Sequence, residues 1–104
     1  MKLLAVYTTV AGLDAARAMA RTLVERKLAA CAQIEEIESF YAWQGKLEND
    51  REFRILFKTT EARWPAVEAA IRELHGYELP AIHALALEQV HPPYGRWIEE
   101  ECKP

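Results

Sequence analysis

The sequence predicts an α+β domain with the ferredoxin-like βαββαβ order, a long hairpin between its second and third strands, and a C-terminal helix. Three observations support this class. Two segments carry apolar residues at intervals of three and four, four segments are strand-like, and two of those strands are joined by one tight turn. The length suits one core, so we expect residues 1–104 to form a single domain.

The first 28 residues predict the first strand and the first helix. Residues 2–9 are almost continuously apolar, which is typical of a central strand covered on both faces. Gly12 lies in the break that follows this strand. Over residues 13–28, apolar side chains form a stripe at helical spacing and charged side chains occupy the opposite side. We therefore expect a surface helix that packs on the sheet.

The segment of residues 31–59 predicts two long antiparallel strands. Its second arm alternates, with Phe53 and Phe57 on an apolar side and charged residues on the other. The first arm carries apolar groups on both sides, as expected of a strand covered by a partner. Residues 44–46 form the turn, in which Gly45 supplies the positive φ that a tight hairpin needs.

The first arm of this hairpin should lie at the edge of the sheet and project from the domain. Ile34 and Ile37 fall on opposite sides, so we expect a β-bulge at residues 35–36. An arm of about fourteen residues reaches ~45 Å, beyond the ~13 Å radius of gyration of such a domain. The right-handed crossover rule places this strand at an edge, where unpaired backbone groups favour assembly. We expect Tyr41 and Trp43 in the resulting interface between copies.

The last 45 residues predict a helix, a strand and a short terminal helix. Apolar residues recur at intervals of three and four over residues 64–74, so the helix is expected to end at Gly76. Residues 82–90 are mostly apolar and favour a covered strand. Residues 91–93 break the chain, and a short helix with an aromatic face follows from Tyr94.

Composition excludes several classes of protein. The net charge is −3 with acidic and basic residues interspersed, so we expect no nucleic-acid partner and no membrane partner. Nucleophile motifs and Gly-rich phosphate loops are absent from the sequence, which argues against an enzyme. Cys31 and Cys102, in a chain without a signal-peptide pattern, favour a cytoplasmic protein with reduced thiols. We expect Cys102, near a terminus, to be exposed.

Residues 75–80 bring an imidazole, a phenol and a carboxylate together in His75, Tyr77 and Glu78. Imidazole and carboxylate can ligate a borderline metal, although this spacing matches no closed zinc motif. The alternative is that His75 contacts the final carbonyls of its helix, with Gly76 as the C-terminal cap. Spacing favours the capping role and leaves the metal role open.

Three further residues carry reactive or charged groups. Cys31 can act as a thiolate metal ligand, but free cysteine is more often a small buried hydrophobe, so we expect it in the core. Glu52 and Lys58 project from the polar side of the third strand. They line either a cleft between subunits or an ordinary solvated face, and the solvated face is the simpler interpretation.

Short motifs run in order through nearly the whole chain: Leu28-Ala29-Ala30-Cys31, then Ser39, Tyr41, Trp43 and Gly45, then Glu52 and Lys58-Thr59-Thr60, then His75-x-Tyr77-x-x-Pro80 and Tyr94-x-x-Trp97. Together they closely resemble the CutA family, the divalent-cation tolerance proteins. The resemblance implies a ferredoxin-like protomer that assembles as a trimer through its long hairpins. It also implies tolerance of copper and other divalent cations, without an agreed reaction.

The sequence departs from the family pattern at three places. The usual His-Pro-Tyr is here His75-Gly76-Tyr77, and a Pro-Gly common in the second strand is replaced by Glu35-Glu36. Members credited with copper binding use a cysteine at the end of the first strand and two adjacent histidines. The matching positions here are Thr8 and Leu74-His75, so only His75 agrees.

The sequence thus predicts a cytoplasmic homotrimer that serves binding or signalling, requires no cofactor, and holds Cu²⁺ or another divalent cation weakly through His75 and Cys31. One alternative is a trimer similar to the PII proteins, which senses a small anionic effector in a cleft between subunits near Glu52, Lys58, Tyr77 and Glu78. A second alternative is an acylphosphatase-like enzyme. This fits poorly, because residues 8–12 lack the arginine that a phosphate site after the first strand requires.

Overall fold

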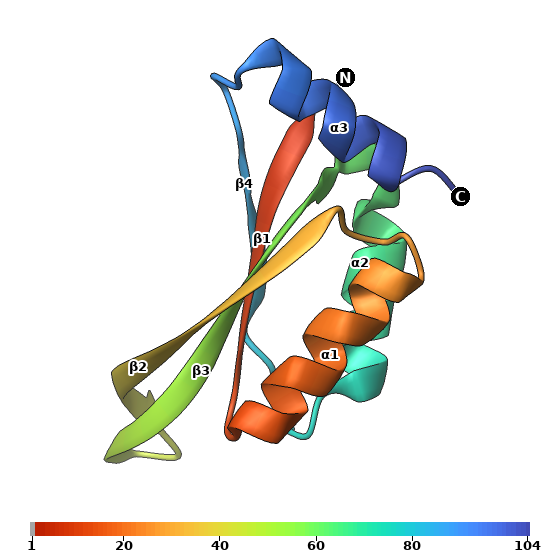
Figure 1. The fold of residues 1–104 in the computed structure, drawn as a ribbon. Helices are drawn as coiled ribbons and strands as arrows, with labels where there is room; N and C mark the ends of the chain where they lie inside the picture. Colours follow the sequence, from red (N-terminus) through yellow and green to blue (C-terminus); the bar gives the residue numbers. More distant parts are fainter. Residues whose placement is uncertain (1) are drawn as a thin grey trace.

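The computed structural model describes residues 2–104 and contains an antiparallel sheet with helices against one of its faces (Figure 1). The first half contains β1 (Leu3–Val10), α1 (Leu13–Glu25), β2 (Cys31–Trp43) and β3 (Lys46–Thr60). The second half contains a 3-10 turn, η1 (Glu61–Arg63), followed by α2 (Trp64–Leu74), β4 (Ile82–Ala86) and α3 (Pro92–Glu101). Within residues 2–104, no helix combines the length and apolarity needed to cross a membrane.

The sheet has the strand order β2-β3-β1-β4, which confirms the ferredoxin-like arrangement. β1 pairs with β3 from Leu3↔Thr60 to Val10↔Phe53, and with β4 on its other side. The two central strands are β1 and β3, as the crossover rule requires. β2 is therefore an edge strand, and its outer backbone edge is open in the protomer.

The main core lies between the sheet and the two helices α1 and α2. Its fully buried side chains come from every layer and include Val6, Leu23, Ile55, Phe57 and Ile71. Burying one such side chain contributes about 1.5–3 kcal/mol relative to leaving it exposed. The alternating arm of the hairpin thus supplies its apolar side to this core, as the pattern predicted.

A second, smaller core lies beneath α3. It contains Leu3, Ala30, Ile98 and Cys102. Cys102 is only 3% exposed, so the expectation of an exposed thiol near the terminus is wrong. The reason lies in the tertiary structure. α3 packs against the start of β1 and the α1–β2 connection, and this contact covers Cys102 at the C-terminal end of α3.

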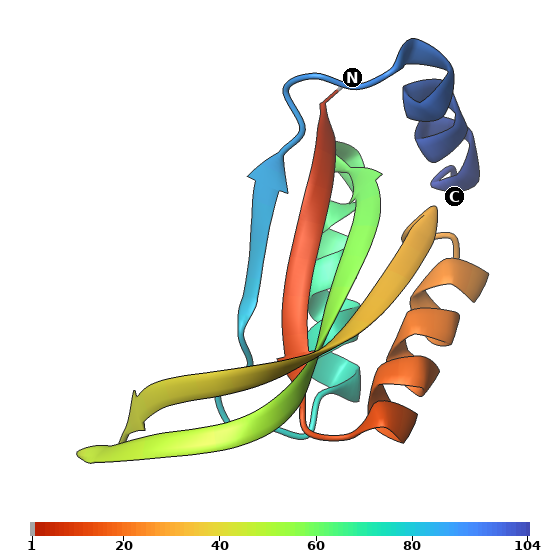
Figure 2. The ribbon, with the colours of Figure 1, turned by 60° about the vertical axis from the view of Figure 1, so that its left-hand side comes forward.

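The hairpin is regular along its whole length. The pairing of β2 with β3 is uninterrupted from Cys31↔Lys58 to Trp43↔Lys46, so the predicted bulge at residues 35–36 is wrong. Ile34 and Ile37 face opposite sides of a regular strand, where Ile34 packs against the main core and Ile37 lines a cleft on the other side. Gln44 and Gly45 have φ of 52° and 78°, as in a two-residue turn with both central residues left-handed. Figure 2 shows the hairpin bending away from the sheet.

Several element ends differ from the prediction for local reasons. α1 stops at Glu25, because Lys27 adopts a left-handed φ of 59° and the Leu28 N–H donates to the Leu23 carbonyl. α2 stops at Leu74, and β4 stops at Ala86 rather than at residue 90. α3 begins at Pro92, since proline is compatible with the first turn of a helix.

Candidate functional site

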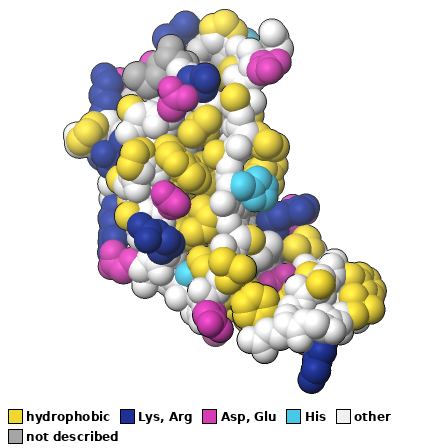
Figure 3. Space-filling view, turned by 180° about the vertical axis from the view of Figure 1, so that it is seen from behind, with side chains coloured by type: hydrophobic (Ala, Val, Ile, Leu, Met, Phe, Trp, Pro, Cys, Tyr) yellow, Lys and Arg dark blue, Asp and Glu magenta, His cyan; other side chains and the backbone are white. Residues whose placement is uncertain are grey.

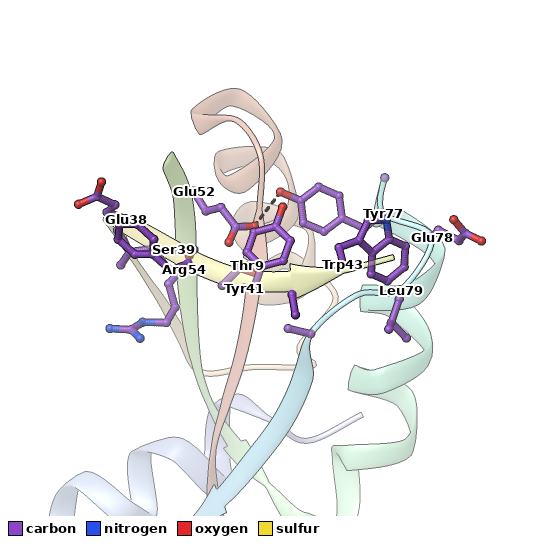
Figure 4. A pocket seen from close by; sticks show the side chains of 15 residues that line it. Thr9, Glu38, Ser39, Tyr41, Trp43, Glu52, Arg54, Tyr77, Glu78 and Leu79 are labelled. Atoms are coloured by element: carbon purple, nitrogen blue, oxygen red, sulfur yellow. Dashed lines mark hydrogen bonds between the residues drawn. The ribbon is translucent and has the colours of Figure 1, made fainter. Parts of the chain in front are cut away.

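A cleft of about 980 Å³ opens between the hairpin and the segment that connects α2 to β4 (Figure 4). β2 supplies one wall, β3 supplies the floor, and the connecting segment supplies the opposite wall. The residues that matter for its chemistry are Glu38, Tyr41, Trp43, Glu52, Arg54, Tyr77 and Glu78. The structure therefore brings Glu52, Tyr77 and Glu78 together, and places Tyr41 and Trp43 beside them.

Glu52 and Tyr77 form the central contact of this cleft. Glu52 is only 7% exposed, and it accepts a hydrogen bond of 2.7 Å from the Tyr77 hydroxyl. Burial and the nearby Glu52 carboxylate raise the pKa of Tyr77 well above its ordinary value. Tyr77 consequently stays a neutral hydrogen-bond donor throughout the physiological range.

Tyr41 is held by a second carboxylate on the same side of the hairpin. Its hydroxyl donates to Oδ2 of Asp50 over 2.5 Å, and this bond is the main reason that the pKa of Tyr41 rises to about 12. Asp50 was not among the site residues expected from the sequence. The hairpin register could have revealed it, because a turn at Gly45 pairs Ser39 with Asp50 and puts Tyr41 on the adjacent diagonal.

His75 uses both of its ring nitrogens. Nε2 donates to the Thr9 carbonyl oxygen over 2.7 Å, and Nδ1 accepts from the Tyr77 N–H over 3.1 Å. The expected contact with the final carbonyls of its own helix is therefore wrong, since its acceptor belongs to β1. The expected C-terminal cap at Gly76 is also wrong, because the cap residue of α2 is His75, which is extended, and Gly76 does not adopt a positive φ.

A separate cluster forms at the other end of the sheet. Lys58 places Nζ 3.3 Å from the Tyr94 hydroxyl and 5.6 Å from the centre of that ring. Cys31 is half-buried rather than in the core, with Sγ 3.9 Å from the same hydroxyl. Within one protomer, Lys58 thus does not line the cleft that contains Glu52, and the expected cleft between subunits stays a prediction. The contact of Tyr94 with Lys58 and Cys31 was not expected from the sequence.

The protomer does not offer the donor set of a closed metal site. Within the described part of the chain, no three histidine, cysteine, aspartate or glutamate side chains are grouped so that they could hold a metal ion. His75 contacts Thr9, near the end of β1, whereas Cys31 is paired with Lys58, which lies opposite Ala5 near the start of β1. The two residues with an expected metal role therefore lie toward opposite ends of the sheet.

Comparison with known proteins gives a consistent result. Residues 4–101 match the family model described as CutA1 divalent ion tolerance protein. The divalent-cation tolerance protein CutA of Pyrococcus horikoshii is 39% identical over 98 residues, which cover 94% of this chain and 96% of that protein.

Solved structures agree with the sequence matches. The periplasmic divalent cation tolerance protein CutA of Archaeoglobus fulgidus superposes with a TM-score of 0.95 at 34% identity, covering 97% of this chain and 99% of that one. The Cut A1 protein of Thermus thermophilus gives a TM-score of 0.93 at 35% identity, covering 97% of this chain and 99% of that one. The chain therefore belongs to the CutA1 divalent ion tolerance family.

Proposed function

We propose that this chain serves divalent-cation tolerance as a homotrimeric binding protein rather than as an enzyme, and that each protomer holds Cu²⁺ or a similar divalent cation only weakly. The observation that carries the proposal is the match of residues 4–101 to the CutA1 family, to which this chain belongs. The relative from P. horikoshii, which is similar over almost its full length, is named for divalent-cation tolerance.

The state of His75 supports weak rather than tight metal binding. A metal ion needs a ring nitrogen with a free lone pair, but Nε2 carries the hydrogen that it donates to Thr9 and Nδ1 accepts from Tyr77. Binding at His75 must therefore break one of these hydrogen bonds. Cys31 offers a half-buried thiol elsewhere, so each cation would have one strong protein ligand per protomer.

The shape of the hairpin supports assembly. The protomer measures 45 × 25 × 22 Å along its principal axes, and the projecting hairpin exposes 65% of Phe40 and 77% of Leu47. Figure 3 shows apolar side chains at the end of this projection. Exposed apolar groups beside an open strand edge are the features that proteins use for association.

The alternative of a PII-like sensor for an anionic effector is disfavoured by the charge of the cleft. Glu52 faces the cleft, whereas Figure 4 shows the carboxylates of Glu38 and Glu78 directed away from it, and Arg54 is its one cationic lining residue in the described part of the chain. Arg54 already pairs with Glu35, with Nη2 and Oε1 2.7 Å apart. Within one protomer, Lys58 lies beside Tyr94 and does not line this cleft.

Sedimentation of the purified chain at micromolar concentration tests the assembly. We expect three times the protomer mass of 11.9 kDa. A monomer would refute the trimer. Calorimetric titration with Cu²⁺ and Zn²⁺ should show weak binding, and tight stoichiometric binding would refute the single-ligand description. The cytoplasmic location remains a prediction from the two unpaired cysteines.

A further inference from the structure

We propose that Cys31 is a site of oxidative modification, at which a hydroperoxide converts the thiol to a sulfenic acid and the side chains of Tyr94 and Lys58 hold the added oxygen. This proposal goes beyond divalent-cation tolerance, and it does not depend on a trimer. Three features support it: the pairing of Cys31 with Lys58 across two strands, the position of the Tyr94 hydroxyl, and the burial of Cys102.

The thiol of Cys31 belongs to a cluster of polar groups from three elements. Cys31 and Lys58 lie directly opposite each other in the pairing of β2 with β3. Their side chains therefore share one side of the sheet, with Cβ atoms ~4.5–5.5 Å apart. The Tyr94 hydroxyl, which comes from α3, lies 3.9 Å from Sγ of Cys31 and 3.3 Å from Nζ of Lys58. The fold thus brings a thiol, a phenol and an ammonium group together.

The order of donors in this cluster favours an added oxygen. An ammonium group can only donate, so Lys58 donates to the Tyr94 hydroxyl oxygen. The hydroxyl hydrogen of Tyr94 is then available to Sγ of Cys31, which is a weak acceptor. An oxygen bonded to Sγ is a better acceptor than the sulfur. Tyr94 and Lys58 therefore stabilise the sulfenic acid more than they stabilise the thiol.

Both donors are held in place by further contacts. The Tyr94 ring stacks on the Trp97 ring, with 5.7 Å between centroids and 22° between planes. Nζ of Lys58 lies 5.6 Å from the centre of the Tyr94 ring, within the range of a cation–π contact, and 3.4 Å from Oε1 of Gln33. The donors are therefore in position before the oxygen arrives.

The surroundings of Cys31 let the sulfenic acid persist. A sulfenic acid is commonly lost by condensation with a second thiol. The chain has two cysteines, and Cys102 is only 3% exposed in the second core, whereas Cys31 is half-buried. Cys31 also begins β2, twelve positions and ~40 Å along the strand from Trp43. It thus lies away from the hairpin end that we assign to association.

The reaction with hydrogen peroxide is balanced by one two-electron step. The O–O bond of the peroxide breaks as an S–O bond forms at Sγ of Cys31. One peroxide oxygen becomes the hydroxyl of the sulfenic acid, and the other leaves with the thiol proton as water. The sulfur loses two electrons and the peroxide gains them, so hydrogen peroxide is the only co-reactant.

The experiment treats the native full chain with hydrogen peroxide in the presence of dimedone, which labels sulfenic acids, and locates the label by peptide mass spectrometry. We expect the label on Cys31 and at least about tenfold less on Cys102, because susceptibility follows exposure. Absence of label on Cys31 would overturn the proposal, including the case in which a neighbouring copy covers this thiol. Disulfide-linked copies in place of labelled chains would overturn it as well.

Matched variants separate the proposed cluster from mere exposure of a thiol. Peroxide is first removed with catalase, and dimedone is added after a delay, so that the label reports how long the sulfenic acid survives. Tyr94→Phe keeps the ring but removes the hydroxyl, and we expect the labelled fraction to fall at least about fivefold. Tyr7→Phe makes the same change where the ring stacks on His83, and it should stay within about twofold of the wild type. Equal survival in the two variants would contradict the proposal.

Lys58→Met is a second variant, in case Tyr94→Phe fails to fold by circular dichroism. It keeps an aliphatic side chain but removes the ammonium group, and it should also shorten the survival of the sulfenic acid. Sedimentation of the same samples separates this proposal from the proposed function. A monomer that is labelled at Cys31 would refute the trimer and support the modification site. A trimer without label at Cys31 would overturn the modification site alone.

Discussion

His75 joins the end of α2 to the end of β1, because its Nε2 donates to the Thr9 carbonyl oxygen over 2.7 Å. The same ring accepts the Tyr77 N–H and lies 4.9 Å from the Tyr77 ring, between centroids. One imidazole thereby fixes the start of the segment that forms a wall of the cleft. The structural role of His75 therefore depends on its contact with β1 rather than on α2, the helix that it follows.

Replacing His75 with Ala should lower both stability and metal affinity. Two hydrogen bonds are lost, so we expect the free energy of unfolding to fall by about 1–3 kcal/mol. Binding of Cu²⁺ should also weaken if His75 is the main ligand. Urea unfolding and calorimetric titration measure the two effects. His91→Ala is the matched control, because His91 is exposed, and it should change neither quantity. A His75→Ala variant that is less stable but binds Cu²⁺ unchanged would rule out the metal role.

Trp43 and Trp64 should contribute to different properties, Trp43 to association and Trp64 to the stability of the protomer. Trp43 lies at the end of the projecting hairpin, whereas Trp64 packs against the main core of its own protomer. We expect Trp43→Ala to weaken association by about 2 kcal/mol or more, as at a central interface residue. Trp64→Ala should instead destabilise the protomer by about 3–5 kcal/mol. Equal dissociation constants in sedimentation would show that the interface lies elsewhere.

Tyr41 should titrate later than an ordinary tyrosine. Its hydrogen bond to Asp50 favours the neutral phenol and raises the pKa to about 12, from 10.0. The folded state therefore keeps a proton that the unfolded state loses, so this contribution to stability is complete below pH 10 and disappears as pH rises to about 12. Ultraviolet titration of Asp50→Asn should show one tyrosine titrating earlier. Glu48→Gln should have a smaller effect, and a larger one would contradict this assignment.

The two cysteines should react at very different rates. Cys31 is half-buried at the surface, whereas Cys102 is enclosed in the second core and burial raises its pKa. Because the thiolate is the nucleophile, we expect Ellman's reagent to modify one thiol per native chain and two per unfolded chain. Cys31→Ser should remove the fast reaction. A fast reaction that persists in this variant would mean that the second core opens readily.

The sequence by itself determined the order of the helices and strands and which side of β3 faces the core. The alternation that puts Phe53 and Phe57 opposite Glu52 is local, so the buried face of β3 followed from it directly. The turn at Gly45 was predictable for a similar local reason, because glycine adopts a positive φ at little cost, whereas the positive φ of Gln44 has no such signal in the sequence. The family motifs then identified the whole chain, since they recur in order over nearly all of it.

Tertiary structure decided which side chains meet. Glu52 and Lys58 share a side of β3, but they are six positions apart, or ~20 Å along the strand, so Glu52 reaches Tyr77 and Lys58 reaches Tyr94. Cys102 is buried because α3 folds onto β1, a contact between the two ends of the chain. Periodicity reports the side on which a residue lies. It carries no information about the distant segment that covers that side, because the covering segment is chosen by packing of the whole core.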